Sequence, residues 1–167
     1  MSEAPIPDYL GLVVGVRTWR LANTMWARMG GWLWSLAMTD CWCKGEEWKE
    51  AECRKGHRIP GDECMCGIWA FFDVETMERE FGPVFTTGTA WTGEHYEHVS
   101  GIIGAGGDIV EHELGFRAQY AKVLAIFEDE LATPKREIAE MFHCSIVAPS
   151  DYDDFCAEHG LIRLDKE

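Results

Sequence analysis

The sequence predicts an α+β domain: a curved, mostly antiparallel sheet with short packed helices and a zinc-knuckle-like insertion. Three observations support this prediction. β-branched and aromatic runs recur along the first three-quarters of the chain, helix start signals gather in the last third, and a cluster of cysteines with a histidine interrupts the strands. A chain of 167 residues with 47% hydrophobic residues can bury one core. We therefore expect a flexible N-terminal arm over residues 1–10 and a single domain over residues 11–167.

The first elements are predicted to be two paired strands followed by a helix. Residues 12–21, LVVGVRTWRL, are rich in β-branched and aromatic side chains and predict the first strand. Its partner is expected at residues 32–38, after the glycine pair at 30–31. Residues 46–55 use good helix formers, and Gly56 is suited to end a helix there.

The middle of the chain is predicted to continue the sheet. Residues 67–72 form an apolar run that predicts a buried strand. A short helix is expected at residues 74–81, with Asp73 as its N-cap. Residues 95–103 predict another strand, and the glycine-rich stretch 104–107 lacks a phosphate-binding pattern and is interpreted as a tight connection.

The last third predicts a hairpin and then alternating short helices and strands. Residues 108–112 and 116–127 are expected to pair across a turn at residues 113–115. Thr133 and Pro134 form a strong start signal for a helix that reaches about residue 142. The remaining predicted elements are a strand at 144–148, a helix at 150–159 and an edge strand at 161–164.

Four candidate metal ligands fall within fourteen residues, in the spacing C-x3-H-x6-C-x-C. They are Cys53, His57, Cys64 and Cys66. On a helix, Cys53 and His57 would share one face, and on a strand alternate residues such as Cys64 and Cys66 would do the same. Three thiolates and one imidazole are a typical ligand set for structural zinc. The sequence therefore predicts a Zn²⁺ site, with reduced, buried cysteines as the alternative.

Cysteine usage indicates a reducing compartment. The chain has seven cysteines, an odd number, and residues 1–10 lack the features of a secretory signal. No apolar run approaches the ~20 residues of a membrane span. We therefore expect a cytoplasmic protein without a disulfide framework. Cys41 and Cys43 are alternative ligands to His57, so the cysteine-rich metal segment is taken as residues 41–66.

The net charge of -14 is unevenly distributed. Residues 1–58 carry eight Lys and Arg against seven Asp and Glu, whereas residues 59–167 carry seven against twenty-two, a net -15. Such a surface argues against binding to duplex nucleic acid, because that binding depends on cationic neutralisation of phosphates. The acidic surface serves solubility, docking to a basic partner or imitation of nucleic acid.

A second group of candidate functional residues surrounds the predicted turn at 113–115. Glu111, His112 and Arg117 supply a carboxylate, an imidazole and a guanidinium, the groups used in acid–base chemistry and anion binding. Adjacent strand residues point to opposite faces, however, so Glu111 and His112 are expected to diverge. The alternative is a solvated hairpin tip in which Arg117 pairs with a glutamate.

Two motifs carry a family resemblance. C-x-C-G-I-W-A, beginning at Cys64, and residues 107–121, GDIVEHELGFRAQYA, resemble the signature of a family of small uncharacterised proteins of actinobacteria and their phages. The likeness runs from about residue 15 to residue 148, and the chain departs from it at Gly106, where the family usually has Trp. The resemblance supports the architecture and the metal segment, implies a phage-encoded or actinobacterial protein, and carries no activity with it.

Together these features favour a non-catalytic, zinc-stabilised intracellular binding protein, an adaptor or inhibitor of another protein. One alternative is a PUA-like reader of a nucleotide or modified base, with bases stacked on Trp32, Trp34 or Trp91 and phosphate held by Arg117. The other is a zinc-dependent hydrolase. The number of protein ligands separates it from the favoured class, because three ligands leave a position for water and four do not.

Overall fold

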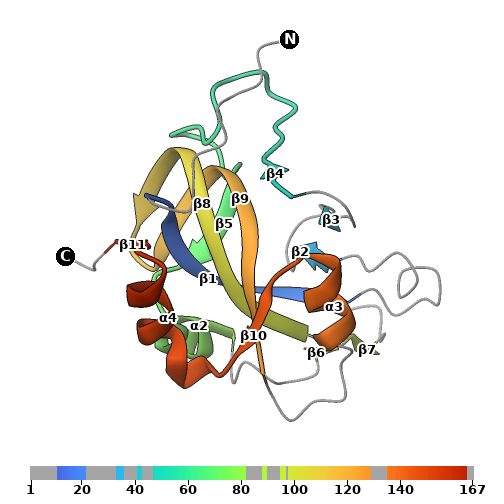
Figure 1. Ribbon diagram of the computed structural model, residues 1–167. Coiled ribbons are helices and arrows are strands. Elements are labelled where there is room, and N and C mark those ends of the chain that lie inside the picture. Colours follow the sequence, from blue (N-terminus) through green and yellow to red (C-terminus); the bar gives the residue numbers. More distant parts are fainter. Residues whose placement is uncertain are drawn as a thin grey trace.

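The computed structural model describes residues 11–21, 33–35, 41–42, 47–81, 88–89, 95–96, 98–128 and 135–164. It confirms the predicted α+β class. Most strands join one nine-stranded mixed sheet, and all but two of its pairings are antiparallel. Among these residues, three short α-helices lie on the outside of the sheet (Figure 1).

Four strands close the sheet into a small barrel. β1 (Val13–Leu21) pairs with β8 (His98–His112), and β8 forms a hairpin with β9 (Gly115–Phe127). β9 then pairs with β5 (Ile68–Phe71), which returns to β1 through the pair Val16 and Phe71. The curl of β8 and β9 around β1 and β5 is visible in Figure 1. Short strands add to the barrel: β2 (Leu33–Ser35), β3 (Cys41–Trp42), β4 (Lys49–Glu50), β10 (Ser145–Val147) and β11 (Ile162–Arg163), while β6 (Gly88–Thr89) and β7 (His95–Tyr96) form a separate pair.

Alternating side chains of the strands build two apolar cores. Ile103 packs inside the barrel with Trp19 and Phe116, and its neighbour Ile102 lies in the cluster outside the barrel. The outer core joins β1, β8 and β9 to the helices, where Met77 is fully buried. The sheet is therefore apolar on both faces, which explains why its strands lack a simple apolar–polar alternation in the sequence.

The glycine-rich stretch at 104–107 does not end a strand, so the predicted tight connection is wrong. β8 continues through it to His112, with a bulge between Gly106 and Ile109 and with Gly107 at a φ of 73°. A Cβ on Gly101 would lie 2.2 Å from the carbonyl oxygen of Ala125. The glycines let a long strand bend tightly against its neighbours.

The described helices lie at their predicted positions. α2 (Val74–Phe81) begins at the predicted cap, where the Thr76 N–H donates to Asp73 Oδ1 at 2.6 Å. α3 (Lys135–Met141) and α4 (Tyr152–Glu158) occupy the predicted positions, and a 3-10 turn (Pro149–Asp151) precedes α4. Thr133 and Pro134 lie outside the described residues. Among the described helices, none has the length and apolar surface needed to cross a bilayer.

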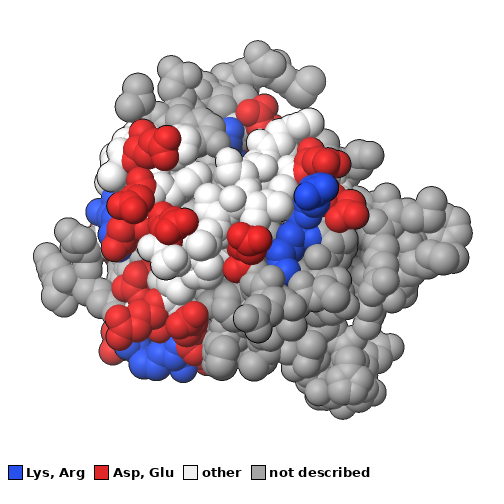
Figure 2. All heavy atoms as spheres, turned by 60° about the horizontal axis from the view of Figure 1, so that its bottom comes forward, with Lys and Arg blue, Asp and Glu red and all other residues white. Residues whose placement is uncertain are grey.

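The helical side of the molecule carries much of the acidic surface. Figure 2 shows Asp and Glu side chains spread over this face, with fewer Lys and Arg side chains lying beside them. Asp153, Asp154 and Glu158 of α4 are all exposed. This surface lies at the opposite end of the barrel from the cysteine-rich loop (Figure 1).

Candidate metal centre

The candidate site lies in the loop between β4 and β5, residues 51–67, here called the metal loop. The predicted helix at 46–55 is wrong: residues 49–50 form β4, which pairs with β9, and the chain then turns at residues 54–55. Helix propensity is overridden here by backbone pairing to the long β9 strand, a tertiary effect that local composition cannot predict. Gly56 sits in a turn at a φ of 69°, a conformation that favours glycine.

The metal loop brings together the four predicted ligands, Cys53, His57, Cys64 and Cys66, with all ligand atoms within 4.8 Å of one another. Cys53 Sγ lies 3.3 Å from His57 Nε2 and 3.8 Å from Cys64 Sγ, and Cys66 Sγ lies 3.9 Å from His57 Nε2. A tetrahedral zinc ion requires about 3.8 Å between two thiolates and about 3.5 Å between thiolate and imidazole nitrogen. The observed separations fit such an ion, so the four residues can bind a metal ion.

Hydrogen bonds around the cluster orient the ligands. His57 Nδ1 lies 2.6 Å from the carbonyl oxygen of Arg58, so this nitrogen carries the proton and donates it. The lone pair of Nε2 then points to the other ligands, the usual arrangement for a metal-bound histidine. The Gly61 N–H donates to Cys66 Sγ at 3.3 Å, which stabilises a thiolate there.

Close packing against the imidazole explains the glycine at position 61. A Cβ on Gly61 would lie 2.5 Å from His57 Cε1, closer than any side chain tolerates. Gly67, at the end of the loop, has a φ of 111° and faces the side chains of Arg117 and Pro60. Glycine therefore fixes both the closure of the loop around His57 and its return to β5.

The pKa values of two thiols in the cluster, Cys64 and Cys66, shift in opposite directions. The backbone N–H of Cys66 and the His57 side chain lower the pKa of Cys64 to about 6. Burial raises the pKa of Cys66. Hydrogen bonds to the Arg58 carbonyl and to Cys64 raise the pKa of His57. A dication would offset the charge that three neighbouring thiolates accumulate, and metal binding requires those thiols to lose their protons.

Arg117 connects the metal loop to the barrel. Its guanidinium is buried, and Nη1 donates to three loop carbonyls, those of Gly61 at 3.2 Å, of Cys66 at 2.9 Å, and of Cys64. It also lies over the ring of Trp69, 5.4 Å from the centroid. The expected pairing of Arg117 with a glutamate is therefore wrong. The side chain instead satisfies carbonyls that the irregular loop leaves without strand partners.

The other residues of the predicted functional turn do not join this arrangement. Glu111 is exposed, and His112 lies on the other face, as expected for adjacent strand residues. The ring of His112 packs 4.5 Å from that of Trp69, and burial lowers its pKa. His112 is thus half-buried, and the expectation of a fully solvated tip is wrong for this residue.

The alternative ligands Cys41 and Cys43 are not placed at the site by the described residues. Cys41 lies in β3, with its side chain outside the description, and Cys43 lies outside the described residues. The cluster already has four ligands without them. Of the proposed stacking residues, the side chain of Trp34 and all of Trp32 and Trp91 also fall outside the described residues.

A cleft of about 710 Å³ lies beside the cluster, between the metal loop and β8. His57 and Cys64 line it from the loop, and residues 108–110 line it from β8. Arg58 joins the two walls through a two-armed ion pair with Asp108, whose Oδ1 lies 2.6 Å from Nη2. This pair lowers the pKa of Asp108. The metal loop thus forms one wall of an open surface cleft.

Comparisons with protein-family models, curated proteins and solved structures gave no match.

Proposed function

We propose that the four-residue cluster holds one structural Zn²⁺ and that the protein is a non-catalytic, zinc-stabilised binding protein. The observation that supports this is the set of four convergent protein ligands, Cys53, His57, Cys64 and Cys66. Zinc is favoured over harder cations because three of the four ligands are thiolates.

The closed ligand set separates this proposal from a zinc hydrolase. A catalytic zinc keeps a coordination position for water, whereas four protein ligands fill the tetrahedron. The bound ion would supply cross-linking of the loop. The surrounding residues keep their own roles: His57 is oriented by its bond to the Arg58 carbonyl, and Arg117 holds the loop backbone. No described residue group favours the nucleotide-reader alternative.

A binding role is supported by where the loop lies. It stands at one end of the barrel and forms a wall of the open cleft, so a stabilised loop presents a fixed surface to a partner. An adaptor or inhibitor needs such a surface and no reactive group. The proposed partner is another protein, since the acidic chain would repel nucleic acid phosphates.

Metal analysis combined with thermal melting tests the proposal. Protein purified without a metal-affinity step should contain about one zinc per chain, and a strong chelator should lower the melting temperature. The same preparation should not hydrolyse activated ester or phosphodiester substrates above the rate of a zinc-free control. Metal-free protein with an unchanged melting curve would contradict the structural site, and zinc-dependent turnover would favour the hydrolase.

A further inference from the structure

The cleft beside the metal centre has a distinct charge pattern. Two carboxylates, Asp62 and Glu63, are exposed on its loop wall, and one cation, Lys55, is exposed on the same wall. Arg58 is neutralised by its two-armed contact with Asp108. Three thiolates and one Zn²⁺ add a further net charge of about -1 at the wall formed by His57 and Cys64. The cleft as a whole is therefore anionic.

The rest of the cleft is suited to a peptide chain. Ile109 and Val110 of β8 and the buried Pro60 supply an apolar lining between the charged groups. The pairing of β1 with β8 ends at Ala105, so residues 108–110 lie beyond the part of β8 that β1 covers. Apolar lining with anionic walls is complementary to a segment that mixes apolar side chains with Lys or Arg.

We propose that this cleft is the docking site for a basic segment of a partner protein, with Asp62 and Glu63 as its main charge contacts. The inference rests on the proposed function, because His57 and Cys64 belong both to the metal centre and to the cleft wall. Loading with zinc fixes that wall, so the cleft takes its binding shape when the metal is bound. Basic side chains enter between the loop and β8, and the apolar side chains of the segment contact Ile109 and Val110.

Fluorescence anisotropy with defined peptides tests the proposal. The probe is a fluorescein-labelled, acetylated octapeptide of alternating Arg and Val, and its counterparts carry Glu or Gln in place of Arg. Zinc-loaded protein should bind the Arg peptide, with an affinity that falls as salt rises, and should not bind the Glu peptide. The double variant Asp62→Lys/Glu63→Lys should weaken binding by roughly tenfold or more, since two attractive contacts become repulsive.

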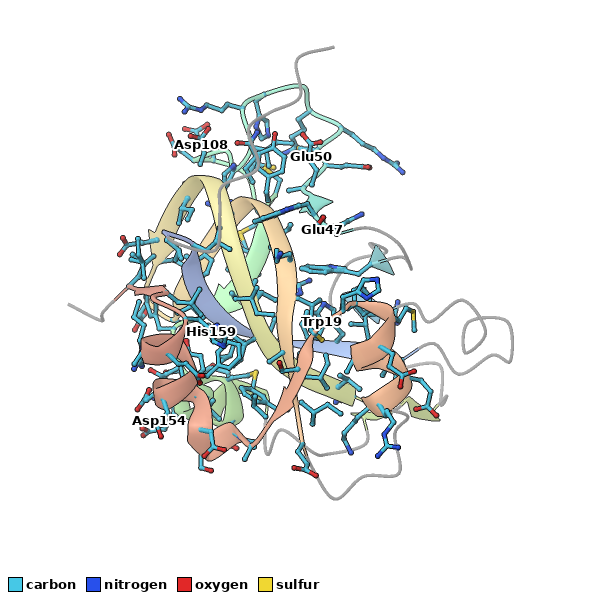
Figure 3. All side chains as sticks on the ribbon, in the orientation of Figure 1. Trp19, Glu47, Glu50, Asp108, Asp154 and His159 are labelled. Carbon is cyan, nitrogen blue, oxygen red and sulfur yellow. The ribbon has the colours of Figure 1, made fainter. Side chains whose placement is uncertain are left out.

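The matched control is Asp154→Lys/Glu158→Lys on α4, which changes the net charge equally at the far end of the molecule. Asp108 and Asp154 mark these two ends in Figure 3. The two control positions lie in the first and last turns of α4, so their effects on the helix dipole offset each other. The control should retain binding within about twofold of the unmodified protein, a change that screening of distant charges allows.

Three results would overturn the docking site. The first is equal weakening of binding by both double variants, which indicates non-specific attraction. The second is preferential binding of the Glu peptide, which indicates an anion site at Lys55 and Arg58. The third is no binding of any peptide. If zinc is present at one per chain and these results appear, only the docking site fails. If zinc is absent from the purified protein, the proposed function fails with it. Chelation that leaves peptide binding unchanged would also overturn the coupling between metal and cleft.

Discussion

The barrel and the metal loop are stabilised by different physical means. The barrel buries large apolar side chains on both faces of its sheet, such as Trp19 and Phe116 inside and Ile102 outside, each fully buried. The metal loop, residues 51–67, buries only Ala51, Pro60 and Cys66. It is held by four candidate metal ligands and by three hydrogen bonds from Arg117. The barrel can therefore fold from hydrophobic burial, whereas the loop depends on specific polar contacts.

The largest expected effect is loss of the metal from the loop. Cys66→Ser should reduce zinc from about one per chain to near zero, because structural zinc contributes on the order of 10–16 kcal/mol of apparent binding energy in small domains. Hydrogen exchange should then rise across residues 51–67, while β8 and β9 stay protected. Cys156→Ser is the matched control, since Cys156 is equally buried but lies in the outer core. Equal loss of zinc in both variants would show that the loop and barrel unfold together.

The second prediction reverses the comparison by weakening the barrel. Phe116→Ala should lower the free energy of unfolding by about 3–5 kcal/mol, because it leaves a cavity next to Gly15 and Ala70. Urea denaturation followed by intrinsic fluorescence measures the change. The zinc content of the folded variant should remain about one per chain. Loss of zinc under conditions where circular dichroism shows an intact fold would mean that the two regions are not separable.

The third prediction addresses the connection between the regions. Arg117→Met removes the donor for three loop carbonyls. It should lower the free energy of opening the metal loop by about 2–4 kcal/mol, with a smaller effect on the barrel. Hydrogen-exchange protection of residues 51–67 and the affinity for zinc measure this loss of stability. Arg17→Met is the control, because Arg17 is similarly buried but donates to the Trp69 carbonyl on β5. Similar loop opening in both variants would argue against a specific role of Arg117.

The smallest effect concerns reactivity and leaves the fold intact. In metal-free protein the pKa of Cys64 is lowered to about 6 from an ordinary value of 9.0. A lowered pKa stabilises the folded loop above pH 9, and this contribution falls between pH 9 and pH 6. Alkylation of Cys64 by iodoacetamide, followed by mass spectrometry, should therefore have a midpoint near pH 6, and zinc should suppress it. A midpoint near pH 9 would contradict the proposed hydrogen bonds.

The local sequence predicts the four-residue cluster well because its members lie close together in the chain. Their spacing alone indicates Cys53, His57, Cys64 and Cys66 as one group. A second local signal, the N-cap residue Asp73, predicts the start of α2. The role of Arg117 was not predicted, since its carbonyl partners lie 51 to 56 residues away in the sequence. The sequence does carry a signal: Arg117 stands between Phe116 and Ala118, at the start of an otherwise largely apolar strand.

Two local predictions failed for reasons that a sequence window does not contain. Residues 46–55 have helix-forming composition, yet β9 recruits residues 49–50 into the sheet. The glycines at 104–107 predict a connection between two strands, yet they let the single strand β8 bend through a bulge. In both cases long-range strand pairing overrides local propensity. The closure of the barrel depends on the pairing of β1 and β5 with the distant β8–β9 hairpin, which local patterns do not contain.

X-ray absorption at the zinc edge of the purified protein tests the central claim most directly. The account predicts four-coordinate zinc with three sulfur ligands at about 2.3 Å and one nitrogen at about 2.0 Å. His57→Cys should shift the spectrum to four sulfur ligands, which assigns the nitrogen to this residue. A spectrum with oxygen from water, with five or more light ligands, or without zinc would contradict a closed structural site built from Cys53, His57, Cys64 and Cys66.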